Sequence, residues 1–263
     1  MTHKPRPILR YYGSGWNRAS WIIDHFPIHD NYLEPCFGSG SILFRKPISK
    51  LETINDIDSR IVNFFEILRT QPHELIQAIL LTPWAEEEFQ ICIHEEEQDP
   101  LEDARRVFFS SWASVRGGPN IGPADFRWQK KLTRRSSAVS DVARLGHLYQ
   151  AAARLKNVQI LNRDALEVID NHAGTGALIY FDPPYLQSKR SNVRGYRFEV
   201  DEAWHIAAAE LLRKHNGPVV ISGYRSELYK YLYEANGWRR VEKQQRTNSG
   251  GSAMECLWLS PGI

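Results

Sequence analysis

Short apolar segments recur along this chain of 263 residues, and stretches with apolar residues at helical spacing separate several of them. The segments that read as strands span residues 31–37, 52–58, 158–161, 177–181 and 218–222. Because strands that alternate with helices join through crossover connections, this pattern predicts an α/β fold with a mainly parallel sheet. The carboxyl ends of parallel strands share one edge, where ligands bind in open α/β sheets. Polar residues directly after these segments are therefore the first candidates for a functional site.

The sequence Asp182-Pro183-Pro184-Tyr185 follows the apolar segment 177–181 and so belongs at this edge. The carboxylate of Asp182 and the carbonyl of Pro183 can each accept one hydrogen bond, and an amino group on a flat ring has two N–H donors. Prolines restrict the backbone and so hold these acceptors in place, while Tyr185 can stack on the face of the ring. The alternative is that the four residues form only a strand-ending turn.

A glycine turn, Gly38-Ser39-Gly40-Ser41, follows residues 31–37, and a helix is expected to start at residues 42–46. Glycines permit positive φ angles and a close approach of the backbone to a ligand. Dinucleotide and phosphate sites share such turns, but no Walker sequence follows here. Glu34, just before the turn, places a carboxylate where it suits a ligand with cationic groups, such as a sulfonium or an α-amino group.

Acidic residues also follow two other strand segments. Asp56 comes about 20 residues after the glycine turn, near the spacing at which an acidic residue accepts hydrogen bonds from ribose hydroxyls. We therefore expect Asp56 to contact a ribose, and Asp58 to be a helix N-cap. Asp164 follows residues 158–161, where it suits both an N-cap and a contact to the adenine end of a nucleotide.

Taken in order, these motifs resemble those of the Dam-type, phage-like DNA adenine N6-methyltransferases of the D12 class. The resemblance covers most of the chain and rests on residues 10–16 (RYYGSGW), 34–41 (EPCFGSGS), 55–58 (NDID), 182–185 (DPPY), 218–224 (PVVISGY) and 255–260 (ECLWLS). It implies a Rossmann-like fold with a mainly parallel seven-stranded sheet and an antiparallel final strand at 255–260. It also implies S-adenosylmethionine (SAM) as cofactor and direct methyl transfer to the N6 amino group of a flipped adenine.

The resemblance, together with the arguments above, assigns the site residues. The catalytic residues are Asp182, Pro183, Pro184 and Tyr185. The cofactor-binding residues are Tyr11, Tyr12, Glu34, Pro35, Cys36, Phe37, Gly38, Gly40, Ser41, Asp56, Ile57, Asp164, Ala165 and Asp182. One position departs from the family, which usually has a lysine two residues after the first glycine of the N-terminal motif. This chain has Gly15 there, and Arg18 is the nearby candidate for a partial replacement.

The same residues leave other functions open. A cytosine-N4 methyltransferase presents a similar motif to a similar amino group, although aspartate at the first position favours adenine. Adenine in RNA is a further alternative substrate. Gly15 favours a degenerate methyltransferase that binds DNA without turnover, whereas the intact Glu34, Asp56 and Asp182 favour an active enzyme. A nucleotide-dependent oxidoreductase would leave residues 183–185 unexplained.

The alternation of strands and helices breaks off between residues 84 and 150, a mostly helical stretch that we expect to be a target-recognition insert. Residues 1–83 and 151–263 would then form the catalytic domain. From residue 104 to 155 the chain has ten basic residues against two acidic ones, although the net charge of the whole chain is only +2. Such asymmetry indicates a surface that meets phosphates.

Double-stranded DNA is therefore the expected partner. Arg105 and Arg106 are expected on a solvated helix face and not on the DNA. The loop at residues 186–199 is expected to clamp the flipped nucleotide or its phosphates, unless it is a simple surface loop. The candidate DNA-binding residues are Arg116, Asn120, Arg127, Gln129, Lys130, Lys131, Arg134, Arg135, Lys189 and Arg190.

Composition excludes several other classes. No apolar run approaches the ~18 residues of a membrane span, and the first residues lack the apolar core of a signal peptide. Cys36, Cys92 and Cys256 lie far apart and the nine histidines show no paired arrangement, so we expect no metal and no disulfide framework. A cytoplasmic location is expected. The resemblance implies a bacterial, prophage or phage origin and leaves room for a cognate restriction endonuclease as a separate partner.

Overall fold

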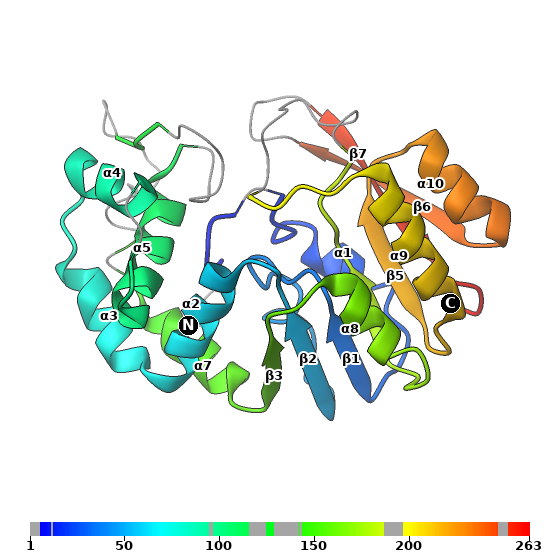
Figure 1. Cartoon of the computed structure of the whole chain (residues 1–263), viewed down its shortest axis with the longest axis horizontal. Helices are drawn as coiled ribbons and strands as arrows, with labels where there is room; N and C mark the ends of the chain where they lie inside the picture. Colours follow the sequence, from blue (N-terminus) through cyan, green and yellow to red (C-terminus); the bar gives the residue numbers. More distant parts are fainter. Residues whose placement is uncertain are drawn as a thin grey trace.

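The computed structural model describes residues 6–11, 13–94, 97–115, 125–128, 142, 144–186, 197–246 and 252–263. They form an α/β fold in which helices flank one seven-stranded sheet of order β3-β2-β1-β4-β5-β7-β6 (Figure 1). The strands are β1 (Asn31–Glu34), β2 (Leu51–Asn55), β3 (Val158–Leu161), β4 (Leu178–Phe181), β5 (Val219–Gly223), β6 (Arg239–Arg246) and β7 (Ser252–Leu259). The predicted α/β class and the mainly parallel seven-stranded sheet are confirmed.

Strands β1 to β5 are parallel, and β7 runs antiparallel to both β5 and β6. The antiparallel final strand expected at residues 255–260 is therefore confirmed in β7. From β1 the sheet grows through β2 and β3 on one side and through β4 and β5 on the other. Such a reversal of strand order opens a crevice at the carboxyl ends of the strands, between β1 and β4.

The helices are α1 (Ala19–Ile23), α2 (Ser59–Thr70), α3 (Pro72–Leu81), α4 (Glu86–His94), α5 (Pro100–Ala113), α7 (Gly146–Leu155), α8 (Ala165–Asn171), α9 (Glu202–Lys214) and α10 (Glu227–Leu232), followed by a 3-10 turn at Glu234–Asn236. The side chain of Asp58 caps α2, and that of Asp164 caps α8, as predicted. Helices α3, α4 and α5 lie together beyond the β3 edge of the sheet (Figure 1). No helix in the described part of the chain is long and apolar enough to cross a membrane.

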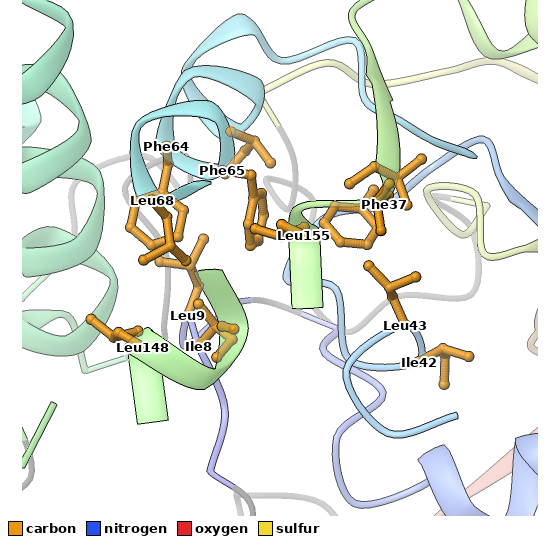
Figure 2. Packing of buried hydrophobic residues seen from close by; sticks show 14 of the residues in the cluster. Ile8, Leu9, Phe37, Ile42, Leu43, Phe64, Phe65, Leu68, Leu148 and Leu155 are labelled. Carbon is orange, nitrogen blue, oxygen red and sulfur yellow. The ribbon is translucent and has the colours of Figure 1, made fainter. Parts of the chain in front are cut away.

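Side chains alternate along the central strands and supply a core to each face of the sheet. Leu178 and Tyr180 of β4 join a cluster with α2, α5 and α7, whereas Ile179 and Phe181 join a cluster with α8, α9 and α10. Figure 2 shows part of the first cluster, where side chains of α2 and α7 lie near those of the N-terminal segment and of Phe37, Ile42 and Leu43, which flank the glycine turn. Because β4 is buried on both faces, its sequence is apolar throughout.

The helix expected at residues 42–46 does not form. The segment instead makes hydrogen-bonded turns, in which the N–H of Phe44 bonds to the carbonyl of Gly40 and that of Lys46 to the carbonyl of Ile42. Pro47 follows directly. A residue before proline is restricted from helical backbone angles, and proline itself has no N–H, so the turn cannot continue as a helix.

Arg105 and Arg106 of α5 do not lie on a solvated face, so that expectation is wrong. Each is 9% exposed. Arg105 pairs with Glu88 of α4 and with Glu102 of its own helix, both at 2.6 Å. Arg106 pairs with Glu102 at 2.8 Å and with Glu97 at 2.9 Å. The acidic residues upstream neutralise these arginines within the protein, so the basic excess of this region overstates the charge that it can offer to DNA.

Helix α7 connects the region of the expected insert to the sheet. Arg154, near the end of α7, pairs with the buried Glu52 of β2 and so belongs to the fold rather than to a phosphate-facing surface. The expected boundary after residue 150 falls inside α7. Helix α5 also packs against α2. The division into a catalytic domain and an insert at 84–150 stays a prediction.

Candidate active site

A cavity of about 310 Å³ opens at the carboxyl ends of the strands, where the strand order reverses between β1 and β4. Of the predicted cofactor-binding and catalytic residues, its lining includes Tyr11, Pro35, Cys36, Gly38, Asp56, Ile57, Asp164, Ala165, Asp182 and Pro184. A smaller cavity of about 50 Å³ shares some of these residues and is also lined by Glu34, Phe37, Ser41 and Gly15. Residues from four strand ends thus meet at one place.

Asn55, the last residue of β2, joins two of the loops that form this place. Its side-chain amide donates to the carbonyl of Pro35 at 2.9 Å and to the carbonyl of Arg163 at 3.0 Å. Its side-chain oxygen accepts from the N–H of Arg163 at 2.9 Å. Asn55 is 1% exposed and makes three of the four hydrogen bonds that an asparagine side chain can make. The loop after β1 and the loop after β3 are therefore held together through the end of β2.

Two glycines shape the turn after β1. Gly38 and Gly40 have φ angles of 53° and 69°, in the left-handed region. A Cβ on Gly40 would lie 2.5 Å from the ring of Phe37 and 2.6 Å from that of Phe44, so a side chain has no room there. The ring of Phe37 packs in the core, edge-on to Phe65 with the ring centroids 4.9 Å apart (Figure 2). Gly40 and Phe37 thus support the turn from the core, whereas Gly38 borders the cavity.

Asp56 receives a backbone N–H on each carboxylate oxygen. Gly38 donates to Oδ2 at 2.7 Å and Asp58 donates to Oδ1 at 2.9 Å. Burial raises the pKa of the Asp56 carboxyl to about 6, although these N–H donors favour the ionised form. At neutral pH the carboxylate is therefore mostly ionised and offers acceptor oxygens at the cavity wall.

Glu34, the last residue of β1, is 2% exposed and accepts a hydrogen bond from the hydroxyl of Tyr32 at 2.8 Å. Burial raises the pKa of its carboxyl well above the usual range, and the nearby Asp182 raises it further. The Tyr32 hydroxyl and the ammonium of Lys46 act in the opposite direction. A cation beside Glu34 would favour its ionised form.

Cys36 lines both cavities, and four nearby carboxyl groups act on its thiol. Burial raises the pKa of the Cys36 thiol well above the usual range, and the charges of Asp56, Asp182, Asp164 and Glu34 raise it further. Such a concentration of carboxyl groups favours a ligand with positive charge. Among the residues that the structure describes, no group of three or more His, Cys, Asp or Glu side chains is placed to hold a metal ion.

The carboxylate of Asp182 is oriented from the neighbouring strand. Ser222 of β5 donates its hydroxyl proton to Oδ1 of Asp182 at 2.6 Å, and the hydroxyl of Tyr180 lies 3.0 Å from that of Ser222. Because the Ser222 proton goes to Asp182, Tyr180 is the donor in the second contact. A carboxylate held in this way through one oxygen can offer its second oxygen to a ligand.

Tyr185 is held at its hydroxyl and at its ring. The side chain is 6% exposed, and its hydroxyl donates to Oε1 of Glu255 in β7 at 2.5 Å. The ring lies edge-on to that of Tyr224, with centroids 4.8 Å apart. Both contacts hold the ring in position before a substrate binds, but stacking on a substrate stays a prediction.

Residues 197–200 and Trp204 of helix α9 also line the larger cavity. The ring of Trp204 stacks on Phe181 of β4 with centroids 5.8 Å apart, which fixes its place at the wall. Arg197 pairs with Asp58 at 3.4 Å and so attaches this segment to the start of α2. The end of the loop expected to clamp a nucleotide therefore borders the cavity.

Most of the predicted DNA-binding residues, and Tyr12, lie outside the described residues. They are Arg116, Asn120, Gln129, Lys130, Lys131, Arg134, Arg135, Lys189 and Arg190. Arg127 is described, and its backbone is anchored beside α5. Its N–H donates to the carbonyl of Ala113 at 2.6 Å, and its carbonyl accepts from the indole of Trp84 at 3.1 Å. Its contact with DNA stays a prediction.

Asn55, Ser222 and Glu255 belong to the site but were not predicted as site residues. Asn55 and Ser222 lie at or next to the carboxyl end of their strands, which was the available signal, whereas Glu255 is the fourth of the eight residues of β7. Their partners Arg163, Asp182 and Tyr185 are 108, 40 and 70 residues away in sequence. Because β7 is antiparallel to β5, Cys256 of β7 pairs with Gly223 at the end of β5, and this pairing brings the neighbouring Glu255 to the site.

The sheet with its antiparallel β7, and the acid-lined cavity where the strand order reverses, define a Rossmann-like methyltransferase. Residues 11–247 match the model of the D12 class N6 adenine-specific DNA methyltransferases, and the chain belongs to this family. It is also similar to the Type II methyltransferase M.MjaIII of Methanocaldococcus jannaschii. The alignment extends over 283 residues with 22% identity and covers 94% of each chain. The resemblance seen in the sequence motifs is confirmed.

Proposed function

We propose that this protein transfers a methyl group from SAM to the N6 amino group of adenine in double-stranded DNA, after the adenine has been flipped out of the helix. Membership of an N6 adenine-specific family supports the target atom. The observation that carries the proposal is the carboxylate of Asp182, oriented by Ser222 beside an acid-lined cavity. Such a site can hold an amino group next to a cationic cofactor.

The residues of the cavity fit the chemistry of this cofactor. When bound, SAM supplies a methyl group on a positively charged sulfonium. Glu34 would face its cationic groups, since a cation stabilises the ionised form of a carboxyl that burial makes hard to ionise. Asp56 would accept hydrogen bonds from the ribose hydroxyls. Asp164 and Ala165 line the larger cavity together with Asp56 and would contact the adenine end.

Asp182 and Pro183 would bind the target amino group. The carboxylate of Asp182 and the carbonyl of Pro183 each accept one of the two N–H bonds, which favours a pyramidal nitrogen with a localised lone pair. Acceptors that are already in place contribute through positioning and electrostatics, with little rearrangement during the reaction. The hydrogen bond from Ser222 would keep the carboxylate in place before the substrate arrives.

An adenine inside a duplex must leave the base stack, which costs a few kcal/mol. Stacking on Tyr185 would recover about 1–3 kcal/mol of this. The hydrogen bond to Glu255 and the edge contact with Tyr224 hold the tyrosine ring ahead of binding. Basic residues, Arg127 among them, would contact the phosphates on either side of the flipped base.

Methyl transfer from labelled SAM to unmethylated plasmid DNA, followed by nucleoside analysis of the product, tests the proposal. We expect N6-methyladenine. N4-methylcytosine would contradict the assignment of the base, and label that enters RNA but not DNA would contradict the assignment of the nucleic acid. Calorimetric binding of the cofactor with no methylated nucleoside in any substrate would contradict an active enzyme.

Substitution of Asp182 tests the role of its carboxylate. We expect Asp182→Ala to abolish methylation and Asp182→Asn to lower turnover by about 100- to 1000-fold, while DNA binding survives. Asp30→Asn is the matched control, since it makes the same chemical change at an exposed carboxylate paired with Lys50, before the start of β1. Turnover in Asp182→Ala close to that of the control would show that the carboxylate is not catalytic.

A further inference from the structure

We propose that Arg18 and Glu255 are positioning residues for Tyr185, and that their buried ion pair holds the tyrosine ring in the orientation that the target base requires. The inference rests on the proposed function, because the flipped base gives the ring its task. It concerns residues that touch neither the cofactor cavity nor the reacting atoms, since the described lining of the two cavities includes neither Arg18 nor Glu255.

Glu255 is the centre of this arrangement. Its Oε1 accepts the hydroxyl proton of Tyr185 at 2.5 Å, while its Oε2 lies 2.7 Å from Nη1 of Arg18. The side chains of Glu255 and Arg18 are 2% and 12% exposed, so little water competes for either contact. Because the two contacts use different oxygens, one carboxylate can hold the tyrosine and the arginine at the same time.

Arg18 is in turn fixed by the segment before α1. Its Nη2 donates to the carbonyl of Gly13 at 2.8 Å, and its backbone N–H donates to the carbonyl of Gly15 at 2.8 Å. A Cβ on Gly15 would lie 3.9 Å from Nη2 of Arg18, which places the guanidinium directly beside this buried glycine. One guanidinium and one carboxylate therefore tie together the N-terminal segment, β7 and the loop after β4.

The charges around Glu255 make Arg18 its main counterion. Burial raises the pKa of the Glu255 carboxyl, Arg18 opposes this shift, and the negative charge of Asp182 adds to it. On the adjacent strand β6, Lys243 is the register partner of Glu255, but its ammonium lies over the ring of Trp21, 5.7 Å from the centroid. Without Arg18, the carboxyl would face Asp182 in a buried setting and would shift towards its protonated form.

Fixing the hydroxyl of Tyr185 limits where its ring can lie. The ring is also held edge-on to Tyr224, at an interplanar angle of 75°. A ring that is oriented in advance can meet the flipped base without a search through rotamers, and a displacement of about 1 Å at a reacting centre can lower a rate by about a hundredfold. The network should therefore affect the rate of methyl transfer and leave the affinity for the cofactor nearly unchanged.

The test compares variants of the full-length protein that retain a cooperative unfolding transition. Tyr185→Phe removes the donor of the hydrogen bond and Glu255→Met removes its acceptor, Arg18→Met removes the cation, and Arg18→Lys keeps the charge. Lys50→Met is the matched control, because Lys50 makes an ion pair of the same 2.7 Å length that is exposed and distant from the site. Single-turnover methyl transfer gives the rate, and calorimetry gives the cofactor Kd.

We expect Tyr185→Phe, Glu255→Met and Arg18→Met each to lower the single-turnover rate by about 10- to 100-fold, with the cofactor Kd within about threefold of wild type. Combining Tyr185→Phe with Glu255→Met should slow the reaction no further, because both remove the same hydrogen bond. Arg18→Lys should restore most of the rate. The rate of Arg18→Met should recover as the pH rises, because a carboxyl with a raised pKa then regains its charge.

Additive losses in the double variant would overturn the proposal, as would an Arg18→Met rate equal to that of Lys50→Met. The role of Arg18 would be merely structural if Arg18→Lys did not restore the rate and if the loss of rate in the variants were accompanied by a proportional rise in the cofactor Kd. If wild-type protein methylates no DNA, the proposed function fails separately. NMR of protein with 13C at the tyrosine Cζ then decides: Glu255→Met must shift the Tyr185 signal, and an unshifted signal overturns the inference.

Discussion

Asn55 offers a sharp test of how the site is assembled, because one buried side chain joins the loops after β1 and β3. Its three hydrogen bonds, of 2.9, 3.0 and 2.9 Å, link it to Pro35 and Arg163. At about 1 kcal/mol for each bond, Asn55→Ala should lower the free energy of unfolding by about 3 kcal/mol, and by more where the freed backbone groups stay buried. For a chain of this size, that loss corresponds to a decrease in Tm of about 6–12 °C.

Aspartate has nearly the same shape as asparagine, but Asn55→Asp should nevertheless be no more stable than Asn55→Ala at pH 8. The asparagine gives two N–H donors to two carbonyls, whereas a carboxylate would turn negative oxygens towards the same carbonyls in a buried place. The pKa of the introduced carboxyl should therefore lie above its value of about 3.9 in the unfolded chain. The loss of stability should be complete at a pH above the raised pKa of the folded protein. It should shrink as the pH falls towards the pKa of the unfolded chain.

Urea denaturation at pH 5 and pH 8 measures both variants against wild type, and calorimetry measures the cofactor Kd. When the pH is lowered from 8 to 5, the free energy of unfolding of Asn55→Asp should rise by at least about 1 kcal/mol relative to that of Asn55→Ala. Both variants should bind the cofactor at least about tenfold more weakly, because the loops on the two sides of Asn55 border the cavity. An Asn55→Asp protein that is more stable than Asn55→Ala at pH 8, with no dependence on pH, would refute this reasoning.

Three further predictions concern the cavity and its walls. Because burial raises the pKa of Glu34, cofactor binding should tighten as the pH rises and should release a proton from Glu34. Calorimetry in buffers of different ionisation enthalpy should detect this release in wild type but not in Glu34→Gln. Gly40→Ala should destabilise the protein by about 2–5 kcal/mol, whereas Gly176→Ala should cost about 1 kcal/mol, because Gly176 has a φ of 65° but open space around the position of a Cβ. Equal losses on urea denaturation would refute a role for crowding at Gly40. Ser222→Ala should slow single-turnover methyl transfer by about 10- to 100-fold at an unchanged cofactor Kd, and an unchanged rate would show that Asp182 needs no orienting donor.

The sequence predicted the strands that carry the site because each is a short apolar run followed by polar residues. Asp56, Asp164 and Asp182 follow β2, β3 and β4 respectively, and all three border one cavity in the structure. Parallel strands bring their carboxyl ends to the same edge, so this convergence follows from the fold class alone. The N-caps at Asp58 and Asp164 were equally predictable, since a cap depends on neighbours within a few residues.

Two predictions failed because they extended a local pattern too far. Residues 42–46 have apolar residues that suit a helix, but Pro47 ends the turn after a few residues. The basic excess at Arg105 and Arg106 indicated a solvated face, but both side chains are nearly buried in ion pairs, partly with residues of α4 and the segment that follows it. A count of charges along the chain cannot show that two oppositely charged segments fold against each other.

The sequence by itself determined the class of sheet, the loops that carry the acceptors and, through the order of its motifs, the family. Only the tertiary structure decided how those loops are held: Asn55 between two loops, Ser222 on Asp182, and Arg18 with Glu255 behind Tyr185. The physical reason is that a hydrogen bond or ion pair depends on distance and direction in space. Its partners here are 40 or more residues apart except across Asn55 and Pro35, which are separated by 20, so no local spacing along the chain encodes them.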